Sequence, residues 1–287
     1  MITNVLVVGA GTMGNGVAQV CAQNGLSVTM TDVTRAAAEK GLAAIERSLS
    51  RLLEKGKIDE AARAAALGSI TLSTDPAGAA SGADLVIEAV PERMELKLEL
   101  FRAIGSRAPS HALLATNTSS LSVTEIAGVS GAPDRVVGLH FFNPVPLMEL
   151  LEIVRGLGTS DATVDAARTF AAQIRKRPIV VNDAPGFATS RLGVILGCEA
   201  IRMLESGVAS AQDIDLAMEL GYRHPMGPLR LTDLVGLDVR LAILEHLHKE
   251  LGEQFRPPSL LRQMVRAGRL GKKVGRGFYD YPSEPSK

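Results

Sequence analysis

The sequence lacks the features that mark membrane proteins and strongly charged binding proteins. No apolar run in its 287 residues is long enough to cross a membrane, and 31 basic residues balance 31 acidic ones. The formal net charge is therefore zero, whereas binding to nucleic acids or to membrane surfaces requires a basic field. We expect neither a nucleic acid nor a membrane as a partner. The 46% of hydrophobic residues is ample for a buried core.

The chain is also poor in cysteine. Cys21 and Cys198 lie far apart and form no Cys-x-x-Cys pair, which indicates reduced, structural thiols in a cytoplasmic protein. The N-terminus has neither a basic segment nor a cleavage site before Gly9, so we expect no signal peptide. There is no internal repeat and no low-complexity segment, and we expect no bound metal.

Strands and helices alternate through the first part of the chain. Apolar and β-branched runs predict strands at residues 2–8, 27–31, 83–90, 112–116, 136–141, 150–154 and 178–181. Helical periodicity predicts helices at 14–24, 36–57, 60–67, 94–107 and 162–175, and Ser122 and Glu125 have the spacing of a capping box. This alternation is typical of helices packed around a largely parallel sheet.

The pattern changes at Asn182-Asp183-Ala184-Pro185-Gly186. Beyond it only helical periodicity remains, at residues 188–205, 210–219, 227–234, 238–251 and 259–267. The sequence therefore predicts two domains. Residues 1–184 would form an α/β domain with a Rossmann-type, doubly wound, mostly parallel sheet, and residues 185–287 a smaller all-α domain.

A glycine-rich turn follows the first predicted strand, with the sequence Gly9-Ala10-Gly11-Thr12-Met13-Gly14. Gly9 permits a tight turn, Gly11 lets the backbone approach a pyrophosphate, and Gly14 allows the helix to pack on the strand. Asp32 ends the next strand, where its carboxylate can accept hydrogen bonds from ribose hydroxyls and would repel a 2′-phosphate. NAD is therefore favoured over NADP, although the nearby Arg35 weakens that preference. The alternative is a structural glycine turn with a surface aspartate.

Further polar residues follow predicted strands, namely Glu92, Ser119 and His140. Ligands of open α/β sheets bind at the carboxyl ends of the strands, so these side chains are expected to converge. Each also has an ordinary structural interpretation. Glu92 could be an acid at a helix N-terminus, Ser119 an N-cap or turn hydroxyl, and His140 a core histidine with satisfied hydrogen bonds.

His140 has the chemistry of a proton acceptor beside a dinucleotide. Oxidation of an alcohol removes a hydride from carbon and a proton from oxygen, and histidine titrates near neutral pH. A carboxylate on the second ring nitrogen would fix the tautomer and stabilise the imidazolium. Glu152, on the next predicted strand after a turn stiffened by prolines, is our candidate, and Glu149 is a rival.

Several motifs together resemble those of the L-3-hydroxyacyl-CoA dehydrogenases, a family that includes the 3-hydroxybutyryl-CoA dehydrogenases. They are the glycine turn, Asn117-Thr118-Ser119-Ser120-Leu121, His140-Phe141-Phe142-Asn143-Pro144, Asp183-Ala184-Pro185-Gly186-Phe187, Met226-Gly227-Pro228 and a Gly-Lys-Lys-x-Gly-x-Gly-Phe-Tyr segment ending at Tyr279. Their order and spacing match along essentially the whole chain.

The resemblance implies an NAD-dependent, reversible oxidation of (S)-3-hydroxyacyl-CoA to 3-ketoacyl-CoA. His140 would be the catalytic acid and base, and Glu152 its orienting carboxylate. Ser119 would bond the substrate oxygen near the nicotinamide, and Asn143 would help position nicotinamide and substrate. In this family an active-site asparagine usually stands where this chain has Ser190, whose shorter hydroxyl can still donate a hydrogen bond but has no amide carbonyl.

The resemblance also implies contacts to the cofactor and to coenzyme A. Glu92 and Lys97 match positions that contact the cofactor, and Lys273 is a weaker match. Ser48 and Lys55 match positions that contact coenzyme A, and their spacing of two helical turns places both on one face.

A cationic stripe lies along the same predicted helix. Arg47, Arg51 and Lys55 follow one another at intervals of four residues and could meet the phosphates of coenzyme A. The alternative is a solvated helix face.

The resemblance further implies a homodimer through the helical domain, where helix 188–205 and the segment 221–228 offer surface for self-association. Two rival functions remain at this point. One is oxidation of a sugar acid by a relative of the L-gulonate dehydrogenase type, and the other is a non-catalytic NAD-binding module.

Overall fold

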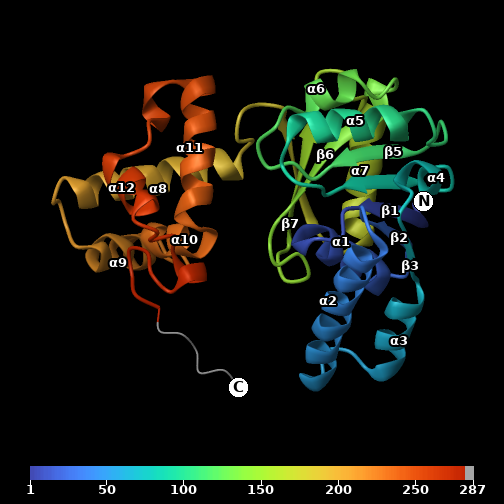
Figure 1. Ribbon diagram of the computed structural model, residues 1–287, viewed down its shortest axis with the longest axis horizontal. Helices are drawn as coiled ribbons and strands as arrows, with labels where there is room; N and C mark the ends of the chain where they lie inside the picture. Colours follow the sequence, from blue (N-terminus) through green and yellow to red (C-terminus); the bar gives the residue numbers. More distant parts are fainter. Residues whose placement is uncertain (282–287) are drawn as a thin grey trace. The chain divides into compact units, whose positions relative to one another are not determined.

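The computed structural model describes residues 1–281, which divide into two compact units. The first is Met1–Ala184, and the second begins at Pro185. The first unit contains all the strands of the described chain, and the second is helical (Figure 1).

The strands of the first unit form one sheet. Within residues 1–281 these are Asn4–Val8 (β1), Ser27–Thr31 (β2), Ile70–Ser73 (β3), Leu85–Glu88 (β4), Leu113–Thr116 (β5), Val136–Phe141 (β6), Leu150–Arg155 (β7) and Arg177–Asn182 (β8). Their order is β3-β2-β1-β4-β5-β6-β7-β8, and every neighbouring pair is parallel except β6 and β7. The carboxyl ends of β1 to β6 therefore share one edge, and the start of β7 lies beside the end of β6.

Helices cover both faces of the sheet. They are Thr12–Gln23 (α1), Arg35–Glu54 (α2), Glu60–Gly68 (α3), Pro76–Ala80 (α4), Met94–Gly105 (α5), Val123–Gly128 (α6) and Asp161–Gln173 (α7), with a 3₁₀ turn at Pro133–Arg135. Figure 1 shows α4, α5 and α6 on one side of the sheet and α1 on the other. The prediction of a doubly wound, mostly parallel sheet is confirmed.

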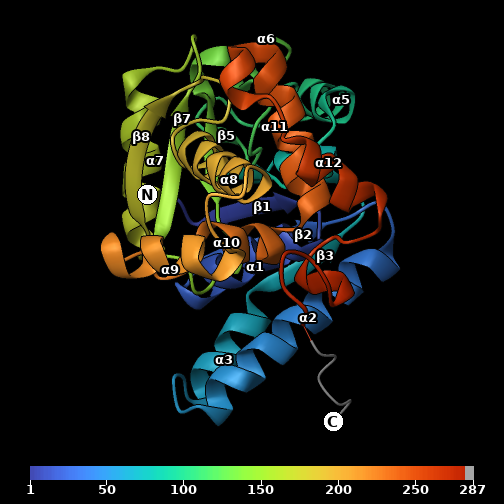
Figure 2. The same cartoon turned by 90° about the vertical axis from the view of Figure 1, so that its left-hand side faces the viewer.

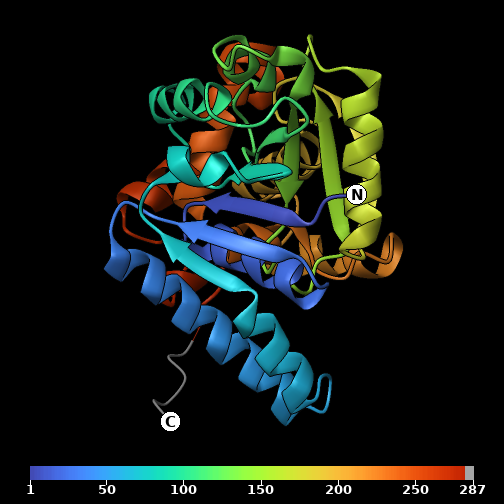
Figure 3. The ribbon, with the colours of Figure 1, turned by 90° about the vertical axis from the view of Figure 1, so that its right-hand side faces the viewer.

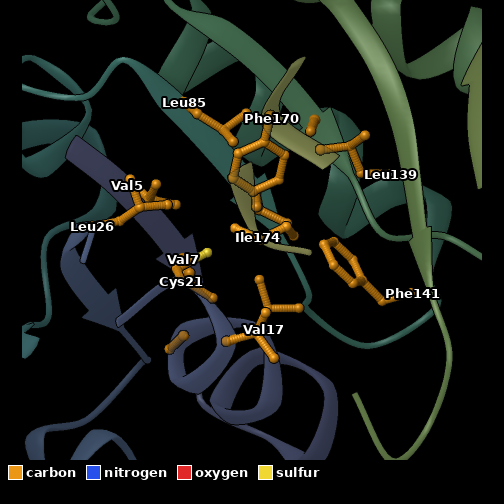
Figure 4. Close-up of a cluster of buried hydrophobic side chains, with 14 of the residues drawn as sticks. Val5, Val7, Val17, Cys21, Leu26, Leu85, Leu139, Phe141, Phe170 and Ile174 are labelled. Carbon is orange, nitrogen blue, oxygen red and sulfur yellow. The ribbon is translucent and has the colours of Figure 1, made fainter. Parts of the chain in front are cut away.

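The main core of this unit lies between the sheet, α1 and α7. Val5 and Val7 point from alternate positions of β1 toward Val17 of α1 and Phe170 of α7 (Figure 4). These side chains are nearly inaccessible to water, and burial of one of this size contributes about 1.5–3 kcal/mol. Leu6, between the two valines, is also buried, as a strand with helices on both faces requires.

Two helices extend from the β3 side of the sheet. α2 and α3 lie side by side, and Figure 3 shows both reaching beyond the strands. α2 buries one face through Ile45 and Leu49, and the side chain of its N-cap residue Thr34 accepts a hydrogen bond from the Ala37 N–H. Its opposite face, which includes Arg47 and Arg51, is exposed.

The second unit contains Thr189–Glu205 (α8), Ala211–Gly221 (α9), Pro228–Val235 (α10), Leu237–Leu251 (α11) and Ser259–Arg266 (α12), with 3₁₀ turns at Glu253–Phe255 and Lys272–Val274. α8 contacts all four other helices, and Figure 2 shows it among them. Val194, Ile201, Leu229, Leu244 and Phe255 form part of a separate core. No helix in residues 1–281 is long and apolar enough to cross a membrane.

Apart from the 3₁₀ turns, one strand and one α-helix of residues 1–281 were not predicted, and both are short. β3 has the sequence Ile70-Thr71-Leu72-Ser73, which is half polar and too brief for a clear period. α4 covers only Pro76–Ala80, capped by Asp75. The predicted cap of α6 is confirmed, because the Ser122 hydroxyl accepts the Glu125 N–H.

Candidate active site

The glycine turn between β1 and α1 has a conformation that larger residues could not adopt. Gly9 has a φ of 102°, and a Cβ there would lie 2.6 Å from the Ala89 carbonyl oxygen. A Cβ on Gly14 would overlap the carbonyl oxygen of Gly9. At Gly11, by contrast, no described atom beyond the two adjacent residues lies within 4 Å of the Cβ position, so the backbone is open to a ligand. α1 starts there without a side-chain cap, and its first N–H groups can receive a phosphate.

Asp32 connects the ends of β1 and β2. Its Oδ2 accepts the Ala10 N–H at 2.8 Å, and its Oδ1 accepts the Val33 N–H at 2.7 Å. Arg35 is engaged elsewhere, because its Nε lies 3.0 Å from Glu39 Oε1 and its Nη1 donates to the Leu72 carbonyl at 3.1 Å. A carboxylate at the end of β2, without a guanidinium free for a 2′-phosphate, fits NAD.

The imidazole of His140 contacts Glu152. The two residues are directly opposite in the antiparallel β6–β7 pair, and His140 Nδ1 lies 2.7 Å from Glu152 Oε2. Glu152 is fully buried, and the His140 side chain is 9% exposed. The rival, Glu149, is exposed and lies 3.9 Å from Arg177 at the start of β8. This arrangement allows a neutral ring with its proton on Nδ1 to exchange a proton through Nε2.

The turn after β5 holds Ser119 against Glu92. Glu92 Oε1 accepts the Thr118 hydroxyl at 2.6 Å and the Ser119 N–H at 2.8 Å, and the Ser119 hydroxyl lies 3.2 Å away. Burial alone would raise the pKa of the Glu92 carboxyl, but the charge of Lys97 and these hydrogen bonds outweigh burial and hold the pKa below its usual range. The predicted meeting of these strand-end residues is thus present for Glu92 and Ser119.

Asn117 joins this turn to the histidine strand. Its side-chain oxygen accepts the Phe141 N–H at 2.8 Å, just where the β5–β6 ladder stops. Asn117 thereby links the turn that carries Ser119 to the strand that carries His140. Phe142 covers the ring of His140, with 4.4 Å between ring centroids.

The loop between β6 and β7 packs on the glycine-turn helix. A Cβ on Gly16 of α1 would lie 2.8 Å from Val145 Cβ, so this close approach requires glycine. The ammonium of Lys176 donates to the carbonyls of Val145 and Met148, both at 2.6 Å, and burial lowers the pKa of Lys176 against the opposing effect of Glu149. Asn143, in the same loop, is exposed.

Sequence reasoning missed two buried charged residues of this region, Lys176 and Glu88. Glu88 ends β4 and is fully buried beside Lys97, whose ammonium lies 2.6 Å from its Oε1. An acid at the end of an otherwise apolar strand was a usable signal for Glu88. Lys176 had none, because its partners are backbone carbonyls distant in the sequence.

The predicted coenzyme A residues lie on α2 and at its end. Ser48 is half-buried, and Arg47, Arg51 and Lys55 are exposed. Within residues 1–281 these three cations form no ion pair, although other exposed arginines, such as Arg35, do. Their charges are thus available to an anionic ligand.

Two predicted residues belong to the second unit. Ser190 lies half-buried in the first turn of α8. Lys273 forms an ion pair with Asp238 at 2.6 Å, and this hydrogen bond holds the pKa of Asp238 below its usual range.

Comparison with known proteins identifies the family. Residues 4–184 match the model of the 3-hydroxyacyl-CoA dehydrogenase NAD binding domain, and residues 186–281 match that of the C-terminal domain. The chain belongs to the 3-hydroxyacyl-CoA dehydrogenase family. The predicted membership, the enzyme class and the NAD cofactor are confirmed by these matches and by the relatives.

Individual relatives agree over nearly the full length. A probable 3-hydroxybutyryl-CoA dehydrogenase of Bacillus subtilis is 46% identical over 99% of both chains. The mitochondrial hydroxyacyl-coenzyme A dehydrogenase of Rattus norvegicus is 43% identical over 98% of this chain and 92% of its own. The crystal structure of (S)-3-hydroxybutyryl-CoA dehydrogenase from Ralstonia eutropha is similar with a TM-score of 0.95 and 45% identity, over 99% of this chain and all of that one.

Proposed function

We propose that this 3-hydroxyacyl-CoA dehydrogenase family member oxidises (S)-3-hydroxyacyl-CoA to 3-ketoacyl-CoA reversibly, with His140 as the general acid and base. The observation that carries the proposal is the buried His140–Glu152 pair, which lies in the same unit as an open glycine turn suited to NAD. Bound NAD supplies the hydride acceptor for C3 of the substrate. A short-chain substrate of the 3-hydroxybutyryl type is supported by the names of the relatives.

The protein's own contribution is proton transfer. In oxidation, Nε2 of His140 takes the proton of the 3-hydroxyl group while Nδ1 keeps its proton toward Glu152. The carboxylate fixes the tautomer and stabilises the imidazolium that forms. In reduction the protonated ring returns the proton to the developing alkoxide, so the same pair serves both directions.

Ser119 and Asn143 would orient the reacting groups. The Ser119 hydroxyl can donate to the substrate oxygen as negative charge develops there, which is stronger than its bond to a neutral carbonyl. The side-chain amide of Asn143 is exposed in the loop that follows His140 and can reach a ligand. Ser190, in the second unit, stands where the family usually has asparagine.

The cofactor and coenzyme A would occupy different parts of the first unit. The glycine turn, Asp32 and Glu92 would hold NAD, with Lys97 a further candidate. The exposed cations Arg47, Arg51 and Lys55 would bind the phosphates of coenzyme A beside Ser48. A free sugar acid has no use for this cationic stripe, which favours an acyl-CoA substrate.

We propose that residues 1–184 bind NAD and that residues 185–287 contribute to substrate binding and form a homodimer. Large apolar side chains of the helical unit are unusually exposed, including Leu192 at 68% and Leu220 at 73%. A second copy would bury them. Light scattering should give twice the chain mass of 30.3 kDa. The two buried, unbridged cysteines support a reducing compartment such as the cytoplasm.

The deciding experiment compares three reactions of the purified protein. We expect NADH consumption with acetoacetyl-CoA and little turnover with a sugar acid and NAD. Turnover of the sugar acid alone would support the L-gulonate type of enzyme. Binding of NADH without either reaction would instead support a non-catalytic module.

A further inference from the structure

We propose that Glu88 and Lys97 are positioning residues that hold Glu92, and through it Ser119, in place for the reaction. The inference rests on the proposed function, because it concerns the presentation of Ser119 to the substrate oxygen. It assigns a role in the site to Glu88. It also gives Lys97 a role other than the cofactor contact implied by resemblance.

Glu88 forms the buried end of this chain of contacts. Its side chain is fully buried at the end of β4, where Oε1 accepts the Val90 N–H at 2.8 Å and Oε2 accepts the Thr116 hydroxyl at 2.7 Å. The carboxylate thereby connects β4 to β5 and to the segment that follows β4. A buried carboxylate also needs a cation close by, and Lys97 supplies it.

Lys97 connects the buried carboxylate of Glu88 to the partly exposed carboxylate of Glu92. Its side chain is 1% exposed, and the ammonium lies 2.6 Å from Glu88 Oε1 and 3.3 Å from Glu92 Oε2. α5 brings the lysine inward, on the same helical face as Phe101 and Ile104. A side chain so enclosed and so bonded is suited to orient Glu92 rather than to reach a ligand in solvent.

Glu92 in turn holds the turn formed by residues 118–120. Thr118 Oγ1 and the Ser119 N–H make the short bonds to its Oε1, and the Ser120 N–H lies 3.2 Å away. The hydroxyls of Ser119 and Ser120 lie at the longer distances of 3.2 and 3.4 Å. The backbone of the turn is thus held chiefly through the short Ser119 N–H bond, while the Ser119 hydroxyl makes a longer bond that a substrate oxygen can replace.

The charges explain why Lys97 is needed. Glu88 and Glu92 are two carboxylates near one ammonium, so removal of the lysine leaves two negative charges with nothing between them. Glu92 would then turn toward solvent or take up a proton. Either change weakens its bonds to the N–H groups of Ser119 and Ser120. Burial raises the pKa of Glu92, and the charge of Lys97 is the largest of the effects that lower it.

The test uses four variants of the full-length protein and a control. Lys97→Met and Glu88→Gln break the pair from either side. The double variant Glu88→Gln/Lys97→Met leaves no unpaired buried charge and keeps an acceptor for Val90 and Thr116, so it protects the test against misfolding. Ser119→Ala removes the hydroxyl itself, and Arg102→Met is the control, because it removes an exposed cation on the same helix.

For each variant we would measure kcat and KM with acetoacetyl-CoA, the Kd of NADH, and amide exchange of the turn. We expect Lys97→Met and the double variant to lower kcat by about 10–100-fold, and NADH affinity to fall by a much smaller factor, because the glycine turn and Asp32 still hold the cofactor. Exchange at the Ser119 and Ser120 amides should become faster. Arg102→Met should match the wild type.

A double-mutant cycle then decides whether Lys97 acts through Ser119. In the Ser119→Ala background, Lys97→Met should cause little further loss of kcat, because Lys97 acts on kcat through the Ser119 hydroxyl, which is already absent. If the losses of kcat caused by Ser119→Ala and Lys97→Met multiply in the combined variant, the proposal is overturned. A large rise in the NADH Kd of Lys97→Met with kcat preserved would also overturn it, because it indicates a direct cofactor contact. Wild-type kcat in the double variant would overturn it too.

The same data separate failure of the inference from failure of the proposed function. If the wild type does not reduce acetoacetyl-CoA, or if Ser119→Ala retains full kcat, the proposed reaction or the role of Ser119 is wrong. Amide exchange still decides the positioning in that case. Unchanged exchange at Ser119 and Ser120 in Lys97→Met and the double variant would refute it, and faster exchange would support it.

Discussion

His140 Nδ1 lies 2.7 Å from Glu152 Oε2, and the two residues face each other across the single antiparallel pair of the sheet within residues 1–281. A cross-strand pair has a fixed register, so the ring is oriented by the sheet itself rather than by a flexible loop. Because Glu152 is fully buried, water does not screen its negative charge, which can stabilise an adjacent imidazolium.

The first prediction concerns the choice of carboxylate. Glu152→Gln keeps the shape but loses the charge, so kcat for acetoacetyl-CoA should fall by about 100-fold or more, with a smaller loss of acyl-CoA affinity. Glu149→Gln is the matched control, because Glu149 is exposed and lies 3.9 Å from Arg177. A fall with Glu149→Gln alone would show that the wrong carboxylate was chosen.

The second prediction concerns the histidine itself. His140→Gln removes the group that exchanges the proton, and turnover should be almost lost, by about 100–10,000-fold in kcat. The glycine turn and Asp32 remain, so NADH should bind with unchanged Kd, as measured by fluorescence. Substantial remaining turnover would refute the role of His140 as acid and base.

The sequence predicted those parts of the site that depend on local geometry. Gly9 and Gly14 could be assigned because their positions tolerate no side chain, and the structure shows why at both. The His140 and Glu152 strands were recognisable, but the choice between Glu149 and Glu152 needed the β6–β7 register. Register depends on pairing between strands and is not visible in either strand alone.

The partners of the buried lysines were beyond sequence reasoning. Lysine is ordinarily a surface residue, and nothing near Lys176 in the sequence indicates burial. Lys176 meets carbonyls about thirty residues away, and Lys97 meets a strand end on the far side of a loop. Such partners come together only when the sheet and helices have packed.

The third prediction tests the support of the β6–β7 loop. Lys176→Met leaves the carbonyls of Val145 and Met148 without their donor, and an unsatisfied buried polar group costs about 1–3 kcal/mol. The free energy of unfolding in urea should fall by about that amount, and kcat should fall because the loop carries Asn143. Arg177→Met is the control, since Arg177 is 85% exposed, and it should change neither quantity.

The fourth prediction is a dependence of stability on acid. The Asp84 carboxylate accepts N–H groups of Thr3 and Asn4; burial would raise its pKa, but these bonds outweigh burial and hold it below the ordinary 3.8. A group with a depressed pKa stabilises the fold above its unfolded value and loses that contribution as pH falls. Urea unfolding should therefore show wild type more stable than Asp84→Asn at about pH 6, with the difference shrinking below 3.8. A constant difference would contradict this reasoning.

The last prediction tests where coenzyme A binds. Arg47, Arg51 and Lys55 form no ion pair within residues 1–281, so their removal breaks no ion pair and should change the stability of the protein little. The triple change to glutamine should raise KM for acetoacetyl-CoA by about tenfold at low salt, with kcat nearly constant, as expected for lost surface charge contacts. The increase should shrink as ionic strength rises, because exposed charges are screened.

Two controls make that result specific. Arg168→Gln removes an exposed cation from α7 and should leave KM unchanged. The N-acetylcysteamine thioester of acetoacetate carries no phosphate, so its KM should not respond to the triple change. If both thioesters respond alike, the stripe acts on the fold or the acyl group. If neither responds, coenzyme A binds elsewhere and the stripe is a solvated helix face.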